Sequence, residues 1–172
     1  MIVVREARPE DMDEIHSMAN KLLMFLKLPY TVIDKETFLI QSGFFPPNTT
    51  PFYHVFVAEE TLDDGTKTVV GYSLDYFMYK TTSKGHTLFI EDLYVDESVR
   101  GKKVGHALMK QSAIRAKQNG CLLMRLECFN WNEHARKFYE SHGGISDGNR
   151  VRSDAITYTF DRNVIDNIVK GS

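Results

Sequence analysis

One stretch of the sequence places two acidic residues shortly before a basic, glycine-bearing segment. The β-rich run Leu88–Val95 contains Glu91 and Asp92, and the segment Arg100–His106 (Arg-Gly-Lys-Lys-Val-Gly-His) then opens a helical pattern. A helix that begins just after a strand presents free backbone N–H groups and the positive end of its dipole, which together bind phosphate groups. The stretch therefore predicts a site for a phosphate-bearing ligand, with two carboxylates beside it for chemistry.

A second group of polar and aromatic residues lies between Trp131 and Tyr139. Asn132 is of a residue type that commonly caps helices, and we expect a helix from there to Glu140 with Ala135 and Tyr139 on one face. Aromatic residues on a short helix most often belong to a hydrophobic core. From the residues alone, Tyr139 is therefore more readily interpreted as a core residue than as a reactive phenol.

Periodicity and turn signals predict the elements that position these residues. An apolar stripe at helical spacing predicts a helix from about Pro9 to just before Pro29, and a weaker one follows at 34–41. A later helix at 104–119 has a stripe that Ser112 and Arg115 interrupt, and residues 43–48 are too proline-rich for a regular element. The expected strands cover 2–7, 52–58, 68–79, 88–95, 121–128, 145–151 and 155–160, with turns at 63–65 and 81–85 and a short helical tail after 161.

The composition is that of an ordinary soluble domain. The chain has 172 residues and a net charge of −2 with both signs interspersed, so no basic face indicates nucleic-acid binding. Its two cysteines, Cys121 and Cys128, are interpreted as reduced and buried, which favours a cytoplasmic location. No signal peptide is recognised at the start, and the absence of a run of ~18 apolar residues argues against membrane insertion.

Three separated motifs resemble the GNAT superfamily of acetyl-CoA-dependent N-acetyltransferases. They are Glu-Asp-Leu-Tyr-Val from Glu91, Arg-Gly-x-x-x-Gly from Arg100 and Trp-Asn-x-x-Ala-x-x-Phe-Tyr from Trp131. Pro51-Phe52-Tyr53-His54 is further similar to the diamine acetyltransferase branch, which includes the spermidine/spermine and thialysine enzymes. The resemblance implies one domain over 1–172 with an α/β fold, in which helices flank a mixed, mostly antiparallel central sheet with a splayed central strand.

The resemblance also implies a set of residues that contact acetyl-CoA, the acetyl donor. The turn before the third helical pattern holds the diphosphate through backbone N–H groups, the splayed strand pairs with the pantetheine arm, and a second helix start contacts the coenzyme. Lys103 stands where members of the family often carry glycine. The expected coenzyme-binding residues are Leu93, Tyr94, Val95, Arg100, Gly101, Lys102, Lys103, Val104, Gly105, His106, Asn132, Glu133, His134 and Ala135.

The same resemblance implies the catalytic roles. Glu91 is the expected base for the amine, directly or through water, and Tyr139 is the expected acid for the departing thiolate. An alternative for the two carboxylates is a structural ion pair with neighbouring strands. Regular alternation points Asp92 to the opposite face of its strand, where we expect it to bind the ammonium group of the substrate. The expected substrate-binding residues are Glu91, Asp92, Phe25, Leu26, Arg125, Leu126 and Glu127.

The sequence departs from polyamine-acetylating relatives at the end of the first helix. The segment Met24–Tyr30 has no acidic residue, and Ser146–Arg150 replaces a Glu-Gly-Trp segment of that branch. An apolar, partly basic wall compensates a polycation poorly, so the hypothesis is a smaller or less cationic amine such as a lysine analogue or short diamine.

Two other functions stay open at this stage: acetylation of a protein amine, and a non-catalytic regulator that binds acyl-CoA. The resemblance further implies a homodimer. The scattered residues His54, His86, His106, His134 and His142 have no metal-ligand spacing, so no metal is expected.

Overall fold

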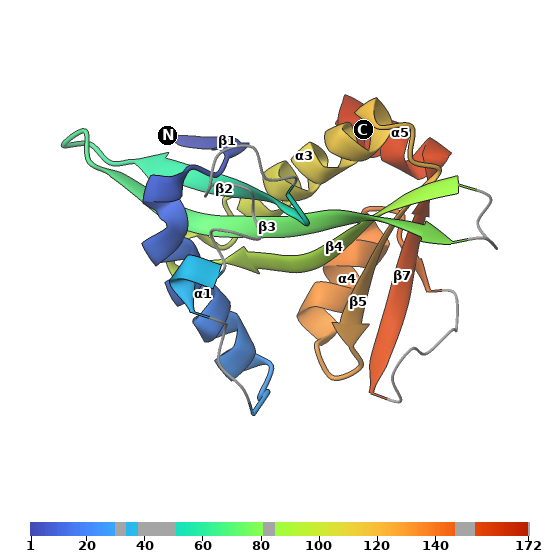
Figure 1. Cartoon of the computed structure of the whole chain (residues 1–172), viewed down its shortest axis with the longest axis horizontal. Helices are drawn as coiled ribbons and strands as arrows, with labels where there is room; N and C mark the ends of the chain where they lie inside the picture. The colour runs from blue at the N-terminus through green and yellow to red at the C-terminus, as the bar shows by residue number, and fades with distance from the viewer. Residues whose placement is uncertain (30–33, 38–50, 81–84, 147–153, 172) are drawn as a thin grey trace. The chain divides into compact units, whose positions relative to one another are not determined.

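The computed structural model describes residues 1–29, 34–37, 51–80, 85–146 and 154–171 (Figure 1). Predictions for Tyr30, the rest of the weaker helix, the loop 43–48, the turn at 81–84 and the segment 147–151 fall outside the described residues. The helices are α1 (Met12–Phe25), α3 (Val104–Gln118), α4 (Glu133–Ser141) and α5 (Arg162–Lys170), and short 3-10 helices cover Pro9–Asp11 and Glu97–Val99. The strands are β1 (Ile2–Glu6), β2 (His54–Thr61), β3 (Lys67–Lys80), β4 (Gly85–Val95), β5 (Leu123–Phe129), β6 (Ile145–Ser146) and β7 (Ala155–Asp161).

The strands form one seven-stranded sheet in the order β1-β2-β3-β4-β5-β7-β6. β1 with β2, β2 with β3, β5 with β7, and β6 with β7 are antiparallel, whereas β4 and β5 are parallel. The predicted α/β class, with a mixed and mostly antiparallel sheet flanked by helices, is confirmed.

Polar caps and a glycine set the ends of the helices near the expected positions. Asn132 Oδ1 accepts a hydrogen bond from the Ala135 amide (3.2 Å) at the start of α4, and Asp161 Oδ1 accepts one from the Val164 amide (3.0 Å) at the start of α5. Gly120, with φ +67°, follows α3 in the left-handed region that favours glycine. The prediction that Asn132 caps a helix is confirmed.

The buried residues of α3 include one that the sequence pattern counted as an interruption. Leu108, Met109 and Ala116 are fully buried as expected, and Ser112 is fully buried as well. The small serine side chain therefore fits within the buried face of the helix rather than breaking it. Both cysteines are free and buried, as predicted.

The described residues form two compact units. Unit 1 is Met1–Asp75 with Asp92–Met109, and unit 2 is Tyr76–Glu91 with Lys110–Ser172. The single domain over 1–172 stays a prediction. The hydrophobic cluster of unit 1 is Phe56, Ala58, Val70, Val99, Val104 and Leu108, and the fully buried side chains of unit 2 include Leu88, Ile90, Met124, Leu126, Tyr158 and Phe160.

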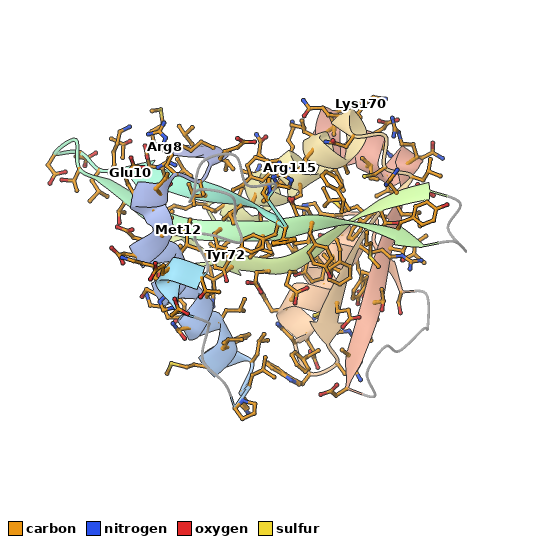
Figure 2. The ribbon with its side chains drawn as sticks, viewed as in Figure 1. Arg8, Glu10, Met12, Tyr72, Arg115 and Lys170 are labelled. Atoms are coloured by element: carbon orange, nitrogen blue, oxygen red, sulfur yellow. The ribbon has the colours of Figure 1, made fainter. Side chains whose placement is uncertain are left out.

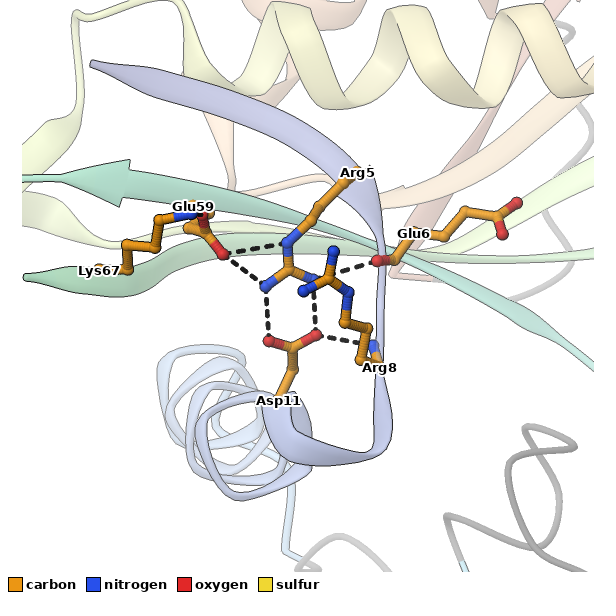
Figure 3. Close-up of polar contacts among 6 residues, drawn as sticks. All are labelled: Arg5, Glu6, Arg8, Asp11, Glu59 and Lys67. Carbon is orange, nitrogen blue, oxygen red and sulfur yellow. Dashed lines mark hydrogen bonds and ion pairs between the residues drawn. The ribbon is translucent and has the colours of Figure 1, made fainter.

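A half-buried ion-pair network joins β1, the entry to α1, and β2 in unit 1 (Figure 3). Arg5 donates from Nη1 and Nη2 to the two carboxylate oxygens of Asp11 (2.7 and 2.8 Å) and from Nε and Nη2 to Glu59 Oε2 (3.0 and 2.6 Å). Lys67 Nζ contacts the other oxygen of Glu59 (2.8 Å). Hydrogen bonds from Lys67 and Arg5 lower the pKa of Glu59 to about 2. Burial raises the pKa of Asp11, but the hydrogen bonds from Arg5 and from the Arg8 amide, together with the charges of both arginines, outweigh it and the net shift is downward.

Arg5→Met is expected to destabilise the protein by about 3 kcal/mol, because it removes the guanidinium that bridges two partly buried carboxylates. Equilibrium urea unfolding at pH 7 measures this loss. The folded-state pKa of Glu59 is depressed, so its stabilisation is present above its unfolded pKa of about 4.3 and is lost as the pH falls towards 2. The variant should therefore lose less stability than the wild type across that interval. Lys67→Met is the control, since the Lys67 side chain is 64% exposed and its removal should cost under about 1 kcal/mol.

Candidate active site

The predicted phosphate-binding turn precedes α3 in unit 1. Gly101 (φ +83°) and Lys103 (φ +62°) both have left-handed backbone conformations, and the helix begins at Val104. Val104 and Leu108 are buried in the core cluster of unit 1, which fixes the first turn of the helix. The first N–H groups of a helix have no carbonyl partner within it. The turn is therefore suited to hold an anion through the backbone.

Two side-chain cations of this turn are held by neighbouring groups of the same chain. Lys102 Nζ lies 3.0 Å from Glu60 Oε1, and Arg100 Nη1 lies 3.1 Å from Glu97 Oε1. Arg100 Nε also donates to the carbonyl of Val95 (3.3 Å), the last residue of β4. Arg100 thereby ties the end of the strand to the turn.

Lys103→Gly is expected to raise the free energy of unfolding by about 0.5–1 kcal/mol. A lysine at φ +62° places its Cβ against the backbone, and glycine has no such contact. Thermal and urea unfolding measure the gain. Lys103→Ala is the matched control, because it removes the same side chain but keeps the Cβ. Equal stability of the two variants would contradict the assignment of strain to this residue.

A buried tyrosine holds the carboxylate of Asp92 in unit 1. The hydroxyl of Tyr72, a fully buried residue of β3 (Figure 2), donates to Asp92 Oδ2 at 2.9 Å. Burial raises the pKa of Asp92 more than this hydrogen bond lowers it. A Cβ at Gly71 would lie 2.8 Å from the carbonyl oxygen of Tyr94, so only glycine allows β3 this close to β4. The expected contact of Asp92 with a substrate ammonium stays a prediction.

The parallel pairing of β4 with β5 ends next to Glu91. The paired positions run from Thr87 with Leu123 to Ile90 with Leu126. Glu91 and Glu127 are the next residues of the two strands, and Glu127 continues to pair with Thr157 of β7. In the described pairing, β4 therefore parts from β5 after Ile90, three residues before the segment Leu93–Val95 that was expected to be splayed. Backbone N–H and C=O groups that are no longer paired with a neighbouring strand can form hydrogen bonds with a ligand.

Two carboxylates and a phenol gather beyond this last pair in unit 2. Tyr76 of β3 packs on Phe89 with ring centroids 5.4 Å apart. Burial raises the pKa of Tyr76, and the charges of Glu91 and Glu127 together with hydrogen bonding to Glu91 add to the shift. Both carboxylates therefore lie near the phenol. Glu91 is exposed and Glu127 is half-buried, so this negative, aromatic-lined face suits a cation.

Tyr139 is held on the other face of the sheet of unit 2. It is 8% exposed, and its ring lies 5.6 Å from that of Tyr158 and 5.5 Å from that of Phe138. The Tyr139 carbonyl accepts from the Gly144 amide (3.0 Å), and a Cβ at Gly144 would lie 2.9 Å from that oxygen. Tyr158 of β7 pairs with Leu126 of β5. Neighbouring residues of a strand point to opposite faces, so Tyr158 and Leu126 lie on the face opposite that of Glu127. Tyr139 therefore lies on the sheet face opposite that of Glu91 and Glu127.

The remaining expected site residues divide between the units. Phe25, which is 45% exposed, and Leu26 end α1 in unit 1, whereas Arg125, Leu126 and Glu127 lie on β5 in unit 2. Leu126 is buried in the core of that unit, and Arg125 is half-buried on the opposite face. Glu133 and His134 are exposed at the start of α4. Their predicted contacts with the coenzyme stay predictions.

Sequence reasoning did not single out Tyr72, Tyr76 or Tyr158. Each depends on the register between strands, which the alternation within one strand does not contain. Among the described residues, no group of three or more His, Cys, Asp or Glu side chains could hold a metal ion. Within the same residues, none of the helices combines the length and apolar character needed to cross a membrane.

Residues 15–144 match the model of the acetyltransferase (GNAT) family, and the chain belongs to this family. Membership defines it as an amine N-acetyltransferase. It is 36% identical over 145 residues to thialysine N-epsilon-acetyltransferase of Bos taurus, with 83% of each chain covered, and 36% identical over 143 residues to that of Mus musculus, covering 81% of this chain and 82% of that protein.

Among solved structures, the paia N-acetyltransferase of Thermoplasma acidophilum in complex with coenzyme A superposes with a TM-score of 0.66. The two are 16% identical, and the match covers 94% of this chain and 99% of the other. At this identity the likeness shows the shared fold.

Proposed function

We propose that the protein transfers the acetyl group of acetyl-CoA to the primary amine of a small molecule by direct attack. The observation that carries this proposal is that the β4–β5 pairing ends at Ile90, directly before Glu91, while Tyr139 packs on Tyr158 on the opposite face of the sheet. The match to the acetyltransferase family over residues 15–144 supports it.

The coenzyme is proposed to lie with its diphosphate against the turn at Arg100–His106. The amides at Gly101, at Lys103 and in the first turn of α3 supply the donors, and the helix dipole adds a favourable potential. The main chain of Leu93–Val95 is proposed to pair with the pantetheine amides. The contacts expected at the start of α4, from Asn132 to Ala135, stay a prediction.

Glu91 is proposed to accept a proton from the substrate ammonium, and Tyr139 to donate one to the leaving sulfur. An alkylammonium has a pKa of about 10, so Glu91 must accept a proton, directly or through water, before the nitrogen can attack the thioester carbonyl. The C–N bond forms and the nitrogen of the tetrahedral intermediate releases its second proton to solvent. The C–S bond then breaks, and the thiolate leaves. Tyr139 donates its phenolic proton to this sulfur, whose thiol pKa is about 8.5, and regains a proton from solvent.

A short cationic amine fits this site better than a long polycation. Glu91 and Glu127 of unit 2 can compensate one or two positive charges, which is fewer than a long polycation carries. Thialysine, named for the relatives at 36% identity, is such an amine and is the proposed substrate type.

Release of free thiol from acetyl-CoA, measured with thialysine, lysine, putrescine, spermine and a lysine-containing peptide, tests the proposal. The highest kcat/KM is expected for thialysine or lysine, with acetyl-CoA and no amine as the blank. A clear preference for spermine would overturn the substrate class, and a preference for the peptide would indicate a protein acetyltransferase. Tight binding of acetyl-CoA by calorimetry with no turnover of any amine would indicate a regulator.

The proposal includes a homodimer and a cytoplasmic location. The free, buried thiols of Cys121 and Cys128 support a reducing compartment. Burial raises the pKa of Cys128 to about 11, which keeps this thiol unreactive. Sedimentation equilibrium tests the dimer directly, and a single species of one-chain mass would exclude it.

A further inference from the structure

One face of unit 2 carries a cation beside the two carboxylates of the proposed site. In the register of β4 with β5, Arg125 is the partner of Phe89, and the next residues in phase are Glu127 and Glu91. The same face continues onto β7, where Thr159 is opposite Arg125 and Thr157 is opposite Glu127. Tyr76 covers Phe89 from β3. These side chains share one face because residues alternate along each strand.

The charges on this face suit a zwitterion better than a polycation. A half-buried guanidinium near Glu91 and Glu127 would repel part of a diamine or a polyamine, whose charges are all positive. Arg125 has five N–H donors in a planar fork, so it can bind a carboxylate while keeping a contact with its own chain. Bidentate pairing of a guanidinium with a carboxylate is among the strongest hydrogen-bonded contacts in proteins.

The spacing along the strands matches an amino acid with an amine at the end of its side chain. Arg125 and Glu127 are two residues apart on β5, which corresponds to about 6.6 Å along the strand. Phe89 and Glu91 have the same separation on the parallel strand β4. In lysine and thialysine, four atoms separate the α-carbon from the terminal nitrogen, and the extended side chain spans about this distance. The rings of Phe89 and Tyr76 flank this path and would contact the methylene or thioether atoms.

We propose that Arg125 determines specificity by binding the α-carboxylate of an amino-acid substrate whose side-chain amine reaches Glu91. This inference rests on the proposed function and deepens it. It assigns lysine-like amino acids, rather than the corresponding diamines, as the substrate class. Arg125 contacts the non-reacting end of the substrate, so its loss acts on binding more than on the chemical step.

Substrate pairs that differ only in the carboxylate test this assignment in the wild-type enzyme. Lysine should be acetylated with a kcat/KM about 10–100-fold above that of cadaverine and of lysine amide, the range expected for a lost charge-assisted contact. This measurement needs no variant and is independent of folding. Equal kcat/KM for lysine and lysine amide would overturn the role of Arg125.

The variant Arg125→Gln should remove this discrimination. Its kcat/KM for lysine should fall about 10–100-fold, mainly through KM, while that for cadaverine changes by less than about threefold. Arg125→Lys should restore part of the preference because it keeps the charge but not the fork. Lys170→Gln, which removes an exposed positive charge at the end of α5 (Figure 2), is the control and should behave as the wild type.

Different results would contradict the proposed acetyltransferase function and the assigned role of Arg125. If no amine releases thiol from acetyl-CoA, the proposed function is wrong. If amines are acetylated but Arg125→Gln lowers lysine and cadaverine turnover by the same factor, only the assignment of Arg125 is wrong.

Discussion

Tyr139→Phe is expected to lower kcat about 10²–10³-fold and to change the dissociation constant of acetyl-CoA by less than about threefold. The substitution removes only the phenolic proton, and transfer of a proton by a positioned acid contributes rate factors of this size. The ring contacts with Tyr158 and Phe138 do not need the hydroxyl, so the fold should be unchanged. Steady-state thiol release gives kcat, and calorimetry gives the affinity for the donor.

Tyr158→Phe is the matched control for this result. Its hydroxyl donates to Glu140 Oε1 at 2.7 Å, and Glu140 is exposed, so the carboxylate can bind water once the hydroxyl is gone. Turnover should therefore fall by less than about threefold. If Tyr139→Phe weakens acetyl-CoA binding as much as it lowers kcat, Tyr139 is a packing residue and the acid must be another group.

The sequence predicted the turn and the helices well because their determinants are local. Gly101 and the basic residues around it mark the start of α3, and Asn132 caps α4 through its own side chain. Both signals act within a few residues along the chain. The position of Lys103 was marked as one where glycine is common, and its φ of +62° gives the physical reason.

The surroundings of the carboxylates could not be predicted in this way. Tyr72 reaches Asp92 and Tyr76 packs on Phe89 because β3 and β4 are neighbours in one particular register. A shift of one residue would exchange every contact, and alternation alone does not fix it. The approach of Glu91 and Tyr139 from opposite faces likewise depends on the pairing of β5 with both β4 and β7.

Glu91→Gln is expected to lower kcat/KM about 10²–10³-fold at pH 7, with a deficit that shrinks as the pH rises. The amide is isosteric but cannot accept the proton of the substrate ammonium. The variant can therefore acetylate only the fraction of the substrate that is already a free amine. This fraction increases tenfold per pH unit below the amine pKa of about 10. In the variant, log kcat/KM should rise with unit slope between pH 7 and 9, whereas the wild type should level off earlier.

Glu127→Gln separates the base from the other carboxylate on this face. Both glutamates lie near Tyr76, and each variant removes one negative charge from the same surroundings. A charge that only attracts the ammonium group should raise KM about tenfold, leave kcat nearly unchanged, and give a deficit that does not depend on pH. If the two variants have the same pH profile, Glu91 acts through its charge alone. The unit slope of Glu91→Gln, absent from Glu127→Gln, distinguishes the acceptance of a proton from electrostatic attraction.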